Sequence, residues 1–355
     1  MIVGNFLFLF LIVNVVRTRR QVELGMACML LTTLVIGILT IQQFHQPKAV
    51  VEDQKLYMGA GALTTANRFD MVIYDGVPGT PSGERRAIGA TSHPAVCAIN
   101  LLLTLPFYAY FCRFGRMWLI RWGAAAATVV VCYNVILTNT RAAIVTMAVV
   151  VSLIFLTGLI RFRPRFLFGA IAVATLVLVA NPADVWRRAL DFSRYSSGVS
   201  EVKERVMMWH AALETIGDNW ILGHGVGNQR EAALRVRRST IISSHNDVTS
   251  AHNDALAILL ETGVGGFLII AAFLFSLHER CRAVERLLGA RGDEPGYFLA
   301  TAARITIYTV LLFGVQVEAL SLPLKAFWLA MGLVISHADQ VFQGLSMGTF
   351  NGAKR

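Results

Sequence analysis

Long apolar runs dominate the pattern of hydrophobic and polar positions, separated by short basic stretches and by two longer mixed segments. A helix needs about 20 apolar residues to cross the roughly 30 Å hydrocarbon core of a bilayer. The runs predict nine membrane-spanning helices, and the first and sixth runs are short. They cover about residues 2–16, 24–41, 94–112, 118–138, 142–160, 166–180, 255–277, 298–317 and 324–340. We therefore predict an all-α polytopic membrane protein with a single integral-membrane domain over residues 1–355.

The two mixed segments fall on the same side of this predicted topology, over residues 42–93 and 181–254. The first is rich in turn-forming residues, and its residues 71–74 predict a short strand. In the second, apolar residues recur every three or four positions over 200–217, which predicts an amphipathic helix. The glycine-rich stretch 220–228 lacks the GxGxxG spacing and no strand precedes it, so it favours a tight turn at the membrane surface over a dinucleotide site.

Composition supports the membrane prediction. Hydrophobic residues make up 55% of the chain and charged residues only 15%, with a mean hydropathy of +0.57. Soluble domains carry about 25% charged residues, so the composition excludes an ordinary soluble enzyme and a disordered chain. The five cysteines match no zinc or CxxC spacing, and four of them lie in or beside apolar runs. We interpret them as small buried hydrophobic residues.

The net charge of +10 comes from 32 basic and 22 acidic residues. Where these residues lie along the chain decides whether the charge indicates membrane topology or a binding surface. Three short loops hold nine arginines and no acidic residue: Arg17, Arg19, Arg20, Arg113, Arg116, Arg121, Arg161, Arg163 and Arg165. The segments 42–93 and 181–254 are each neutral. Because loops rich in Lys and Arg stay in the cytoplasm, the surplus predicts an outer N-terminus and an inner C-terminus. The charge therefore gives no support to nucleic-acid binding.

Two charged residues stand out against this topology. Arg141 follows the fourth span on the outer side, where an arginine is unusual and is costly if it is held in hydrocarbon. Glu318, at the outer end of the eighth span, is a similar exception. In the predicted amphipathic helix, Arg205 lies four residues before Trp209, so both project from nearly the same face. Arg86 lies in the first outer segment, where a solvated loop residue is an equally good interpretation.

The triplet His-Asn-Asp occurs twice, at 245–247 and 252–254. The spacing is not that of a HExxH site and no third ligand is placed by the sequence, so we predict no metal. His252 directly precedes the seventh span, where it is placed to act as a general base or a phosphate contact. Taken alone, however, a histidine at this boundary is more often a polar cap.

Arg141, Arg205 and His252 are thus expected on one side of the membrane, near the interface. Two guanidinium groups suit a diphosphate because each presents a planar fork of donors. A neutral imidazole suits the removal of a proton from a sugar hydroxyl. The set is compatible with glycosyl transfer from a lipid diphosphate, although composition alone does not show that reaction.

Four stretches resemble the O-antigen ligase family, which includes O-antigen polymerases and pilin O-oligosaccharyltransferases. They are Arg86-Ala87-Ile88-Gly89 with His93-Pro94; Leu137-Thr138-Asn139-Thr140-Arg141-Ala142; Arg205 to Trp209 with Ile216 and Leu222-Gly223-His224-Gly225; and His252-Asn253-Asp254-Ala255-Leu256 with Leu260-Glu261-Thr262-Gly263-Val264-Gly265. The last three are similar to the family's Leu-Thr-x-Ser-Arg-x, Arg-x-x-x-Trp with Leu-Gly-x-Gly, and His-Asn-x-x-Leu with Glu-x-Gly-x-x-Gly. The likeness covers about residues 75–270.

The resemblance implies a GT-C-like glycosyltransferase in the bacterial inner membrane that needs no metal or other cofactor. The implied reaction is inverting transfer of a glycan from undecaprenyl diphosphate on the periplasmic face, to a lipid A–core sugar in lipopolysaccharide biosynthesis. By carry-over, Arg141 and Arg205 hold the diphosphate and His252 activates the acceptor hydroxyl. Arg86, His245 and Glu318 are weaker candidates. His252 is preferred to His245 because the family spacing to Leu256 and Glu261 follows it.

Other functions are compatible with these residues. An O-antigen or exopolysaccharide polymerase, or a protein O-oligosaccharyltransferase, would use the same donor. A polysaccharide or lipid transporter is less favoured, because transporters place ionisable residues near the bilayer midplane and often contain repeats, and none is visible here. A non-catalytic scaffold is a third class. The family usually has more spans than the nine predicted here, so we expect the chain to begin inside the fold.

Overall fold

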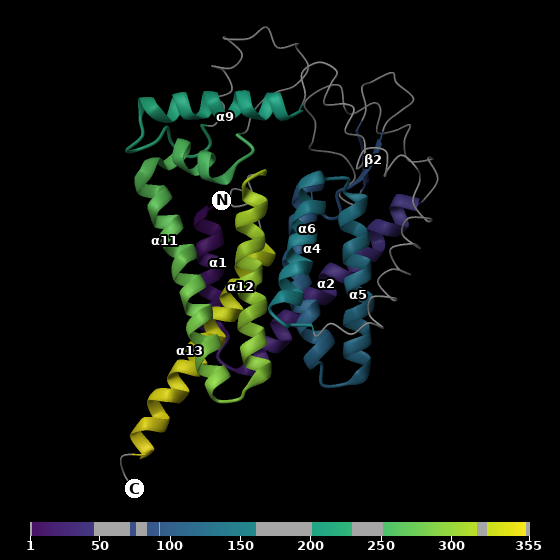
Figure 1. Cartoon of the computed structure of the whole chain (residues 1–355), viewed down its shortest axis with the longest axis vertical. Coiled ribbons are helices and arrows are strands. Elements are labelled where there is room, and N and C mark those ends of the chain that lie inside the picture. The colour runs from purple at the N-terminus through teal and green to yellow at the C-terminus, as the bar shows by residue number, and fades with distance from the viewer. Residues whose placement is uncertain are drawn as a thin grey trace.

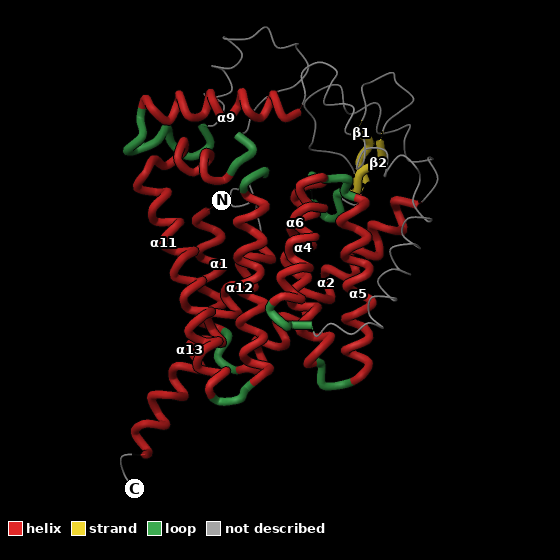
Figure 2. Tube along the Cα trace, viewed as in Figure 1, coloured by secondary structure: helices red, strands yellow, loops and turns green. Residues whose placement is uncertain are grey.

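A computed structural model describes residues 2–45, 72–75, 84–91, 93–160, 201–228, 251–317 and 325–352 (Figures 1 and 2). Its elements are α1 (Ile2–Val15), α2 (Arg19–His45), β1 (Val72–Asp75), β2 (Glu84–Ala87), α4 (Pro94–Phe114), α5 (Trp118–Leu137), α6 (Arg141–Leu156), α9 (Glu201–Asp218), α11 (Asp254–Ala290), α12 (Glu294–Gly314) and α13 (Lys325–Gly352). Eight of the nine predicted spans are helices, and the sixth, about 166–180, lies outside the described residues.

The helices form the predicted all-α polytopic membrane bundle. Within the described residues, five helices are long and apolar enough to cross a membrane, namely α2, α4, α5, α11 and α12, and α6 and part of α13 are shorter apolar helices. The predicted number of nine spans is not established by these elements and stays a prediction. Helix α1 begins towards the upper end of the bundle, and α13 extends below its lower end (Figure 1).

Helix α4 forms the centre of the bundle. It packs against α5, α6 and α12, and most of its side chains are buried. The Tyr108 hydroxyl donates a hydrogen bond to the Leu30 carbonyl at 2.5 Å, which ties α4 to α2. By contrast, α5 and α11 expose large apolar side chains, including Trp122 and Ile269. This division is expected when a bilayer, rather than water, surrounds the outer helices.

Two small elements cover the upper end of the bundle in Figure 1, where α4 and α11 begin. The strand predicted at 71–74 is β1, and it pairs antiparallel with β2 so that Ile73 lies opposite Arg86. Ala87 packs with Phe44 and Leu137, which seats the hairpin on the ends of α2 and α5. The helix predicted over 200–217 is α9, and it lies across this end of the bundle (Figure 1).

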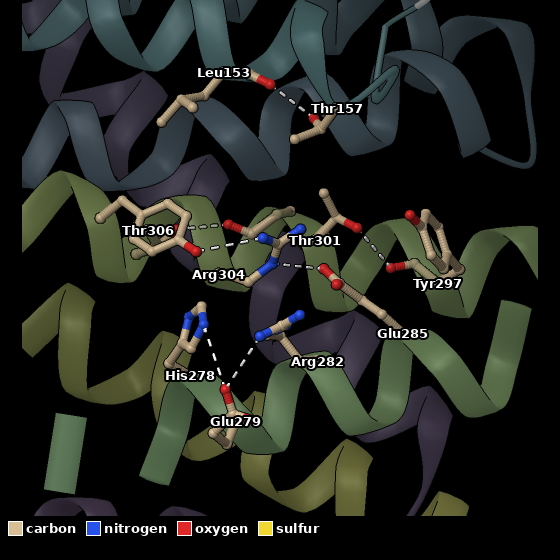
Figure 3. A network of polar contacts seen from close by, with 12 residues as sticks. Leu153, Thr157, His278, Glu279, Arg282, Glu285, Tyr297, Thr301, Arg304 and Thr306 are labelled. Atoms are coloured by element: carbon tan, nitrogen blue, oxygen red, sulfur yellow. Dashed lines mark hydrogen bonds and ion pairs between the residues drawn. The ribbon is translucent and has the colours of Figure 1, made fainter. Parts of the chain in front are cut away.

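The α4–α5 and α11–α12 turns lie at the lower end. Helix α11 runs to Ala290, well beyond the predicted span end at 277, because its polar last turns are held by ion pairs. Arg280 pairs with Asp339 of α13, and Figure 3 shows Glu285 of α11 paired with Arg304 of α12, with Nε and Oε1 2.9 Å apart. Salt bridges therefore extend the helix where hydropathy alone would end it.

Candidate functional site

Arg141 is the first residue of α6 and follows an almost absent turn. Helix α5 ends at Leu137, Thr138 is its C-cap, and Thr140 is the N-cap of α6. The chain reverses because Asn139 adopts a left-handed backbone with φ of 49°. Residues 138–140 are all buried, whereas Arg141 is half-buried. The turn thus fixes the starting point of the Arg141 side chain at the upper end of the bundle.

Arg86 contacts this same turn from the β-hairpin. Its Nε donates to the Thr138 carbonyl at 3.2 Å and its Nη2 donates to the Thr140 hydroxyl at 3.3 Å. The Thr138 carbonyl is one of the last acceptors of α5, where a cation is favourable. Arg86 is therefore not a solvated loop residue. It binds the turn that carries Arg141, and two of the predicted site residues are brought together.

Arg205 and the His252–Asn253 pair meet at the end of α12. Arg205 Nη1 donates to the Gln316 carbonyl at 3.0 Å, and Asn253 Nδ2 donates to the neighbouring Val315 carbonyl at 3.1 Å. These two carbonyls follow the last turn of α12, whose partial negative charge a guanidinium complements. Residues that lie far apart in the sequence are therefore anchored side by side.

Asn253 and Trp209 are the residues that position His252. The Asn253 side chain caps α11 by accepting from the Leu256 amide at 3.1 Å. The Trp209 indole Nε1 donates to the Ala251 carbonyl at 3.0 Å, so α9 binds the residue just before His252. His252 itself is half-buried and has a φ of 48°. The sequence placed Asn253 and Trp209 in the motif stretches that carry the family resemblance, but it gave neither residue a role in the site.

A close contact between two backbone segments locks α9 onto α11. Gly223 and Gly263 both have positive φ, and α11 is kinked at Gly263. A Cβ atom on Gly263 would lie 2.2 Å from the Ile221 carbonyl oxygen, so only glycine fits. The His224 amide donates to the Leu260 carbonyl at 2.8 Å and the Gly225 amide donates to the Glu261 carbonyl at 2.9 Å. The Leu-Gly-x-Gly and Glu-x-Gly stretches therefore form one joint, here called the glycine clasp.

The turn that carries Arg141 and the cluster of Arg205, His252 and Asn253 lie at the same end of the bundle. Helix α12 contacts the elements that carry both. Its C-terminal end carries the carbonyls that bind Arg205 and Asn253, and the helix packs against α6, which begins at Arg141. Arg205 makes no ion pair within the described ranges and uses Nη1 alone, so further guanidinium donors are available for a ligand. Such a site can bind an anion at the membrane boundary.

Two predicted site residues, His245 and Glu318, lie outside the described residues. Across the ranges that the structure covers, no three His, Cys, Asp or Glu side chains are grouped to hold a metal ion. His224, a histidine of the glycine clasp, contacts the Thr215 carbonyl through Nε2 at 2.7 Å. It therefore serves the α9–α11 joint.

Comparison with known proteins places part of this chain beside one family. No curated protein matches the chain significantly. A family model described as O-antigen ligase matches residues 124–271, from within α5 to within α11, and so includes Arg141, Arg205 and His252. Residues 124–271 are thus similar to the O-antigen ligase family, the family that the four motif stretches also resemble.

Proposed function

We propose that this protein transfers a glycan from undecaprenyl diphosphate to a lipid A–core sugar at the periplasmic face of the bacterial inner membrane. The similarity of residues 124–271 to the O-antigen ligase family supports glycan ligation or polymerisation by a multi-pass membrane protein. The observation that carries the finer proposal is the anchoring of Arg205 and Asn253, the neighbour of His252, on adjacent carbonyls at the end of α12. This unites a candidate anion ligand with a candidate base.

Each candidate residue then has a distinct role. His252 accepts the proton of the acceptor hydroxyl as its oxygen attacks the anomeric carbon. The bond from that carbon to the diphosphate oxygen breaks on the opposite face, which inverts the configuration, and the electron pair leaves with undecaprenyl diphosphate. Arg141 and Arg205 bind the diphosphate and stabilise its growing negative charge. Arg86 is a positioning residue, because it donates hydrogen bonds to the turn that presents Arg141.

Deletion of the gene tests the reaction. The lipopolysaccharide and the lipid-linked pool of the deletion strain are compared with the parent strain by gel electrophoresis. We expect bare core on lipid A and long polymer left on the carrier. A single repeat on the core would identify a polymerase instead, and an unchanged lipopolysaccharide and lipid-linked pool would contradict both reactions.

Site variants test the assignment of roles. We expect Arg141→Ala, Arg205→Ala and His252→Ala to abolish transfer at normal membrane levels. Arg116→Ala and His210→Ala are matched controls, because Arg116 lies in the α4–α5 turn at the lower end of the bundle and both side chains are at least three-quarters exposed. Retained transfer in all three site variants would contradict the residue roles while leaving the family resemblance intact. Transfer by purified protein should also survive a chelator, since the proposed mechanism uses no metal.

A further inference from the structure

The loop after α9 presents an unusual group of exposed apolar side chains. Trp220, Ile221, Leu222 and Val226, here called the apolar tip, are each more than half exposed, and Leu222 reaches 78%. In Figure 2 this loop lies at the outer edge of the bundle beside the upper part of α11. Contiguous apolar side chains of this size are costly in water and mark a surface that another phase or molecule covers.

The straight part of α11 below its kink is shorter than the hydrocarbon core of a bilayer. Its apolar run from Val264 to Leu277 has fourteen residues and rises about 21 Å, against about 30 Å of hydrocarbon. Beyond this run the chain carries Glu279, Arg280 and Arg282, which are ion-paired. The residues that complete the span therefore lie at or above the Gly263 kink.

The apolar tip lies at that height. The Val264 amide donates to the Trp220 carbonyl at 2.8 Å, so the tip is fixed to the first residue of the apolar run. Leu268 and Ile269, one turn or more further along α11, are also exposed. The tip thus continues the lipid-facing surface of α11 upward, and tryptophan is a residue that membrane interfaces favour.

Several backbone amides and carbonyls of the loop are hydrogen-bonded within the protein, as burial in a membrane requires. The Asn219 side chain donates to the Gly223 carbonyl at 2.6 Å, and the Gly223 amide donates to the Asn219 carbonyl at 2.9 Å. The amides of His224 and Gly225 are bound by α11 carbonyls in the glycine clasp. Irregular backbone persists at membrane depth only where its polar groups find partners within the protein.

We propose that the apolar tip inserts into the acyl chains of the bilayer leaflet on the α9 side and completes the lipid-facing surface above α11. The hydrophobic effect then holds the start of α11, and with it His252, at the level of the lipid headgroups. This proposal does not depend on which sugar is transferred. It predicts that the tip contacts lipid while the exposed side of α9 contacts water.

Depth-dependent quenching of a fluorophore in proteoliposomes tests the proposal on the full chain. An environment-sensitive thiol probe is attached to Leu222→Cys in a Cys28→Ala background, since Cys28 is an exposed native thiol. His210→Cys is the matched control, because His210 lies on α9 with its side chain 75% exposed. The same background without an added cysteine corrects for labelling of the remaining native thiols.

We expect blue-shifted emission at position 222, strong quenching by lipids that carry a nitroxide near the top of the acyl chain, and little quenching by aqueous iodide. Position 210 should show the opposite pattern. If the Leu222 variant does not fold, Val226→Cys gives the same readout from the other side of the tip. Strong iodide quenching without lipid quenching at the tip position would overturn the proposal.

Discussion

At the scale of single residues, backbone strain is concentrated beside the candidate chemistry. Among the non-glycine residues that the structure describes, Asn139 and His252 have positive φ, at 49° and 48°. Side chains in this conformation cost roughly 1–2 kcal/mol, and Asn and His tolerate it better than most. One lies two residues before Arg141, and the other is the candidate base. The local geometry at both positions is therefore maintained by the surrounding structure, as is common at functional sites.

Because His252 has a positive φ, substitutions can distinguish its role in the backbone turn from its role as a base. His252→Asn should keep the left-handed turn and the melting temperature in detergent, yet lose transfer by roughly 10²–10⁴-fold, the usual contribution of a general base. His252→Val should lose transfer and also melt earlier, because a β-branched residue is strained at positive φ. Transfer by the Asn variant at the wild-type rate would show that His252 is a cap and not a base.

Gly263 gives a second prediction at this scale. Gly263→Ala places a Cβ against the backbone of Ile221, which cannot rotate away, at a φ of 66°. We expect the glycine clasp to open, with a stability loss of at least about 1–3 kcal/mol and loss of transfer. The control is Gly265→Ala, where a Cβ meets no atom within 4 Å and should stabilise the helix by up to about 1 kcal/mol. Thermal melting and transfer assays measure both effects, and equal behaviour of the two variants would contradict the clasp.

At the scale of elements, the hydrogen bond between α9 and the start of α11 links helix docking to catalysis. Trp209→Phe keeps an aromatic ring but removes the donor to the Ala251 carbonyl. We expect a stability loss of about 1 kcal/mol and a larger fall in kcat than the folded fraction explains, because His252 follows Ala251 directly. Trp122→Phe is the control, since Trp122 is exposed on α5. A change in melting temperature without a change in kcat would limit Trp209 to packing.

The elements themselves could be predicted from the sequence because a bilayer imposes a minimum apolar length on each span. The amphipathic helix α9 and the strand β1 also emerged from periodicity and turn residues. The lower end of α11 could not be predicted from hydropathy, because ion pairs with α12 and α13 stabilise its last turns. The partner strand β2 was missed because its sequence, Glu84–Ala87, carries charge where alternation is expected.

The candidate site was predictable as a set of residues but not as an arrangement. The motifs identified Arg141, Arg205 and His252 one by one. They could not show that Arg86 binds the turn before Arg141, or that Arg205 and Asn253 share the end of α12. These contacts join residues more than fifty positions apart, so they depend on how the helices pack. Periodicity and spacing report only on neighbours within one element.

At the scale of the whole molecule, the two ends of the bundle are organised differently. The upper end holds the candidate site, where Arg86 and Arg205 bind helix carbonyls and Arg205 keeps guanidinium donors for a ligand. Towards the lower end, arginines are neutralised by carboxylates: Arg113 pairs with Glu294 and Arg304 pairs with Glu285. Figure 3 shows the second pair within a wider polar network between α11 and α12. Arginine thus supports binding at one end and helix packing at the other.

The Glu285–Arg304 pair tests this division, since both side chains are mostly buried and Glu285 lies in the last turns of α11, far from Asn253. Glu285→Gln should lower the stability by about 3 kcal/mol, because the guanidinium keeps its charge without a carboxylate in a poorly hydrated site. Replacing both residues by leucine removes the uncompensated charge and should recover much of the loss. Transfer per folded molecule should stay unchanged in each variant, measured against melting in detergent. A selective fall in transfer at normal stability would instead mean that the pair is coupled to the site through α12, the helix whose opposite end anchors Arg205 and Asn253.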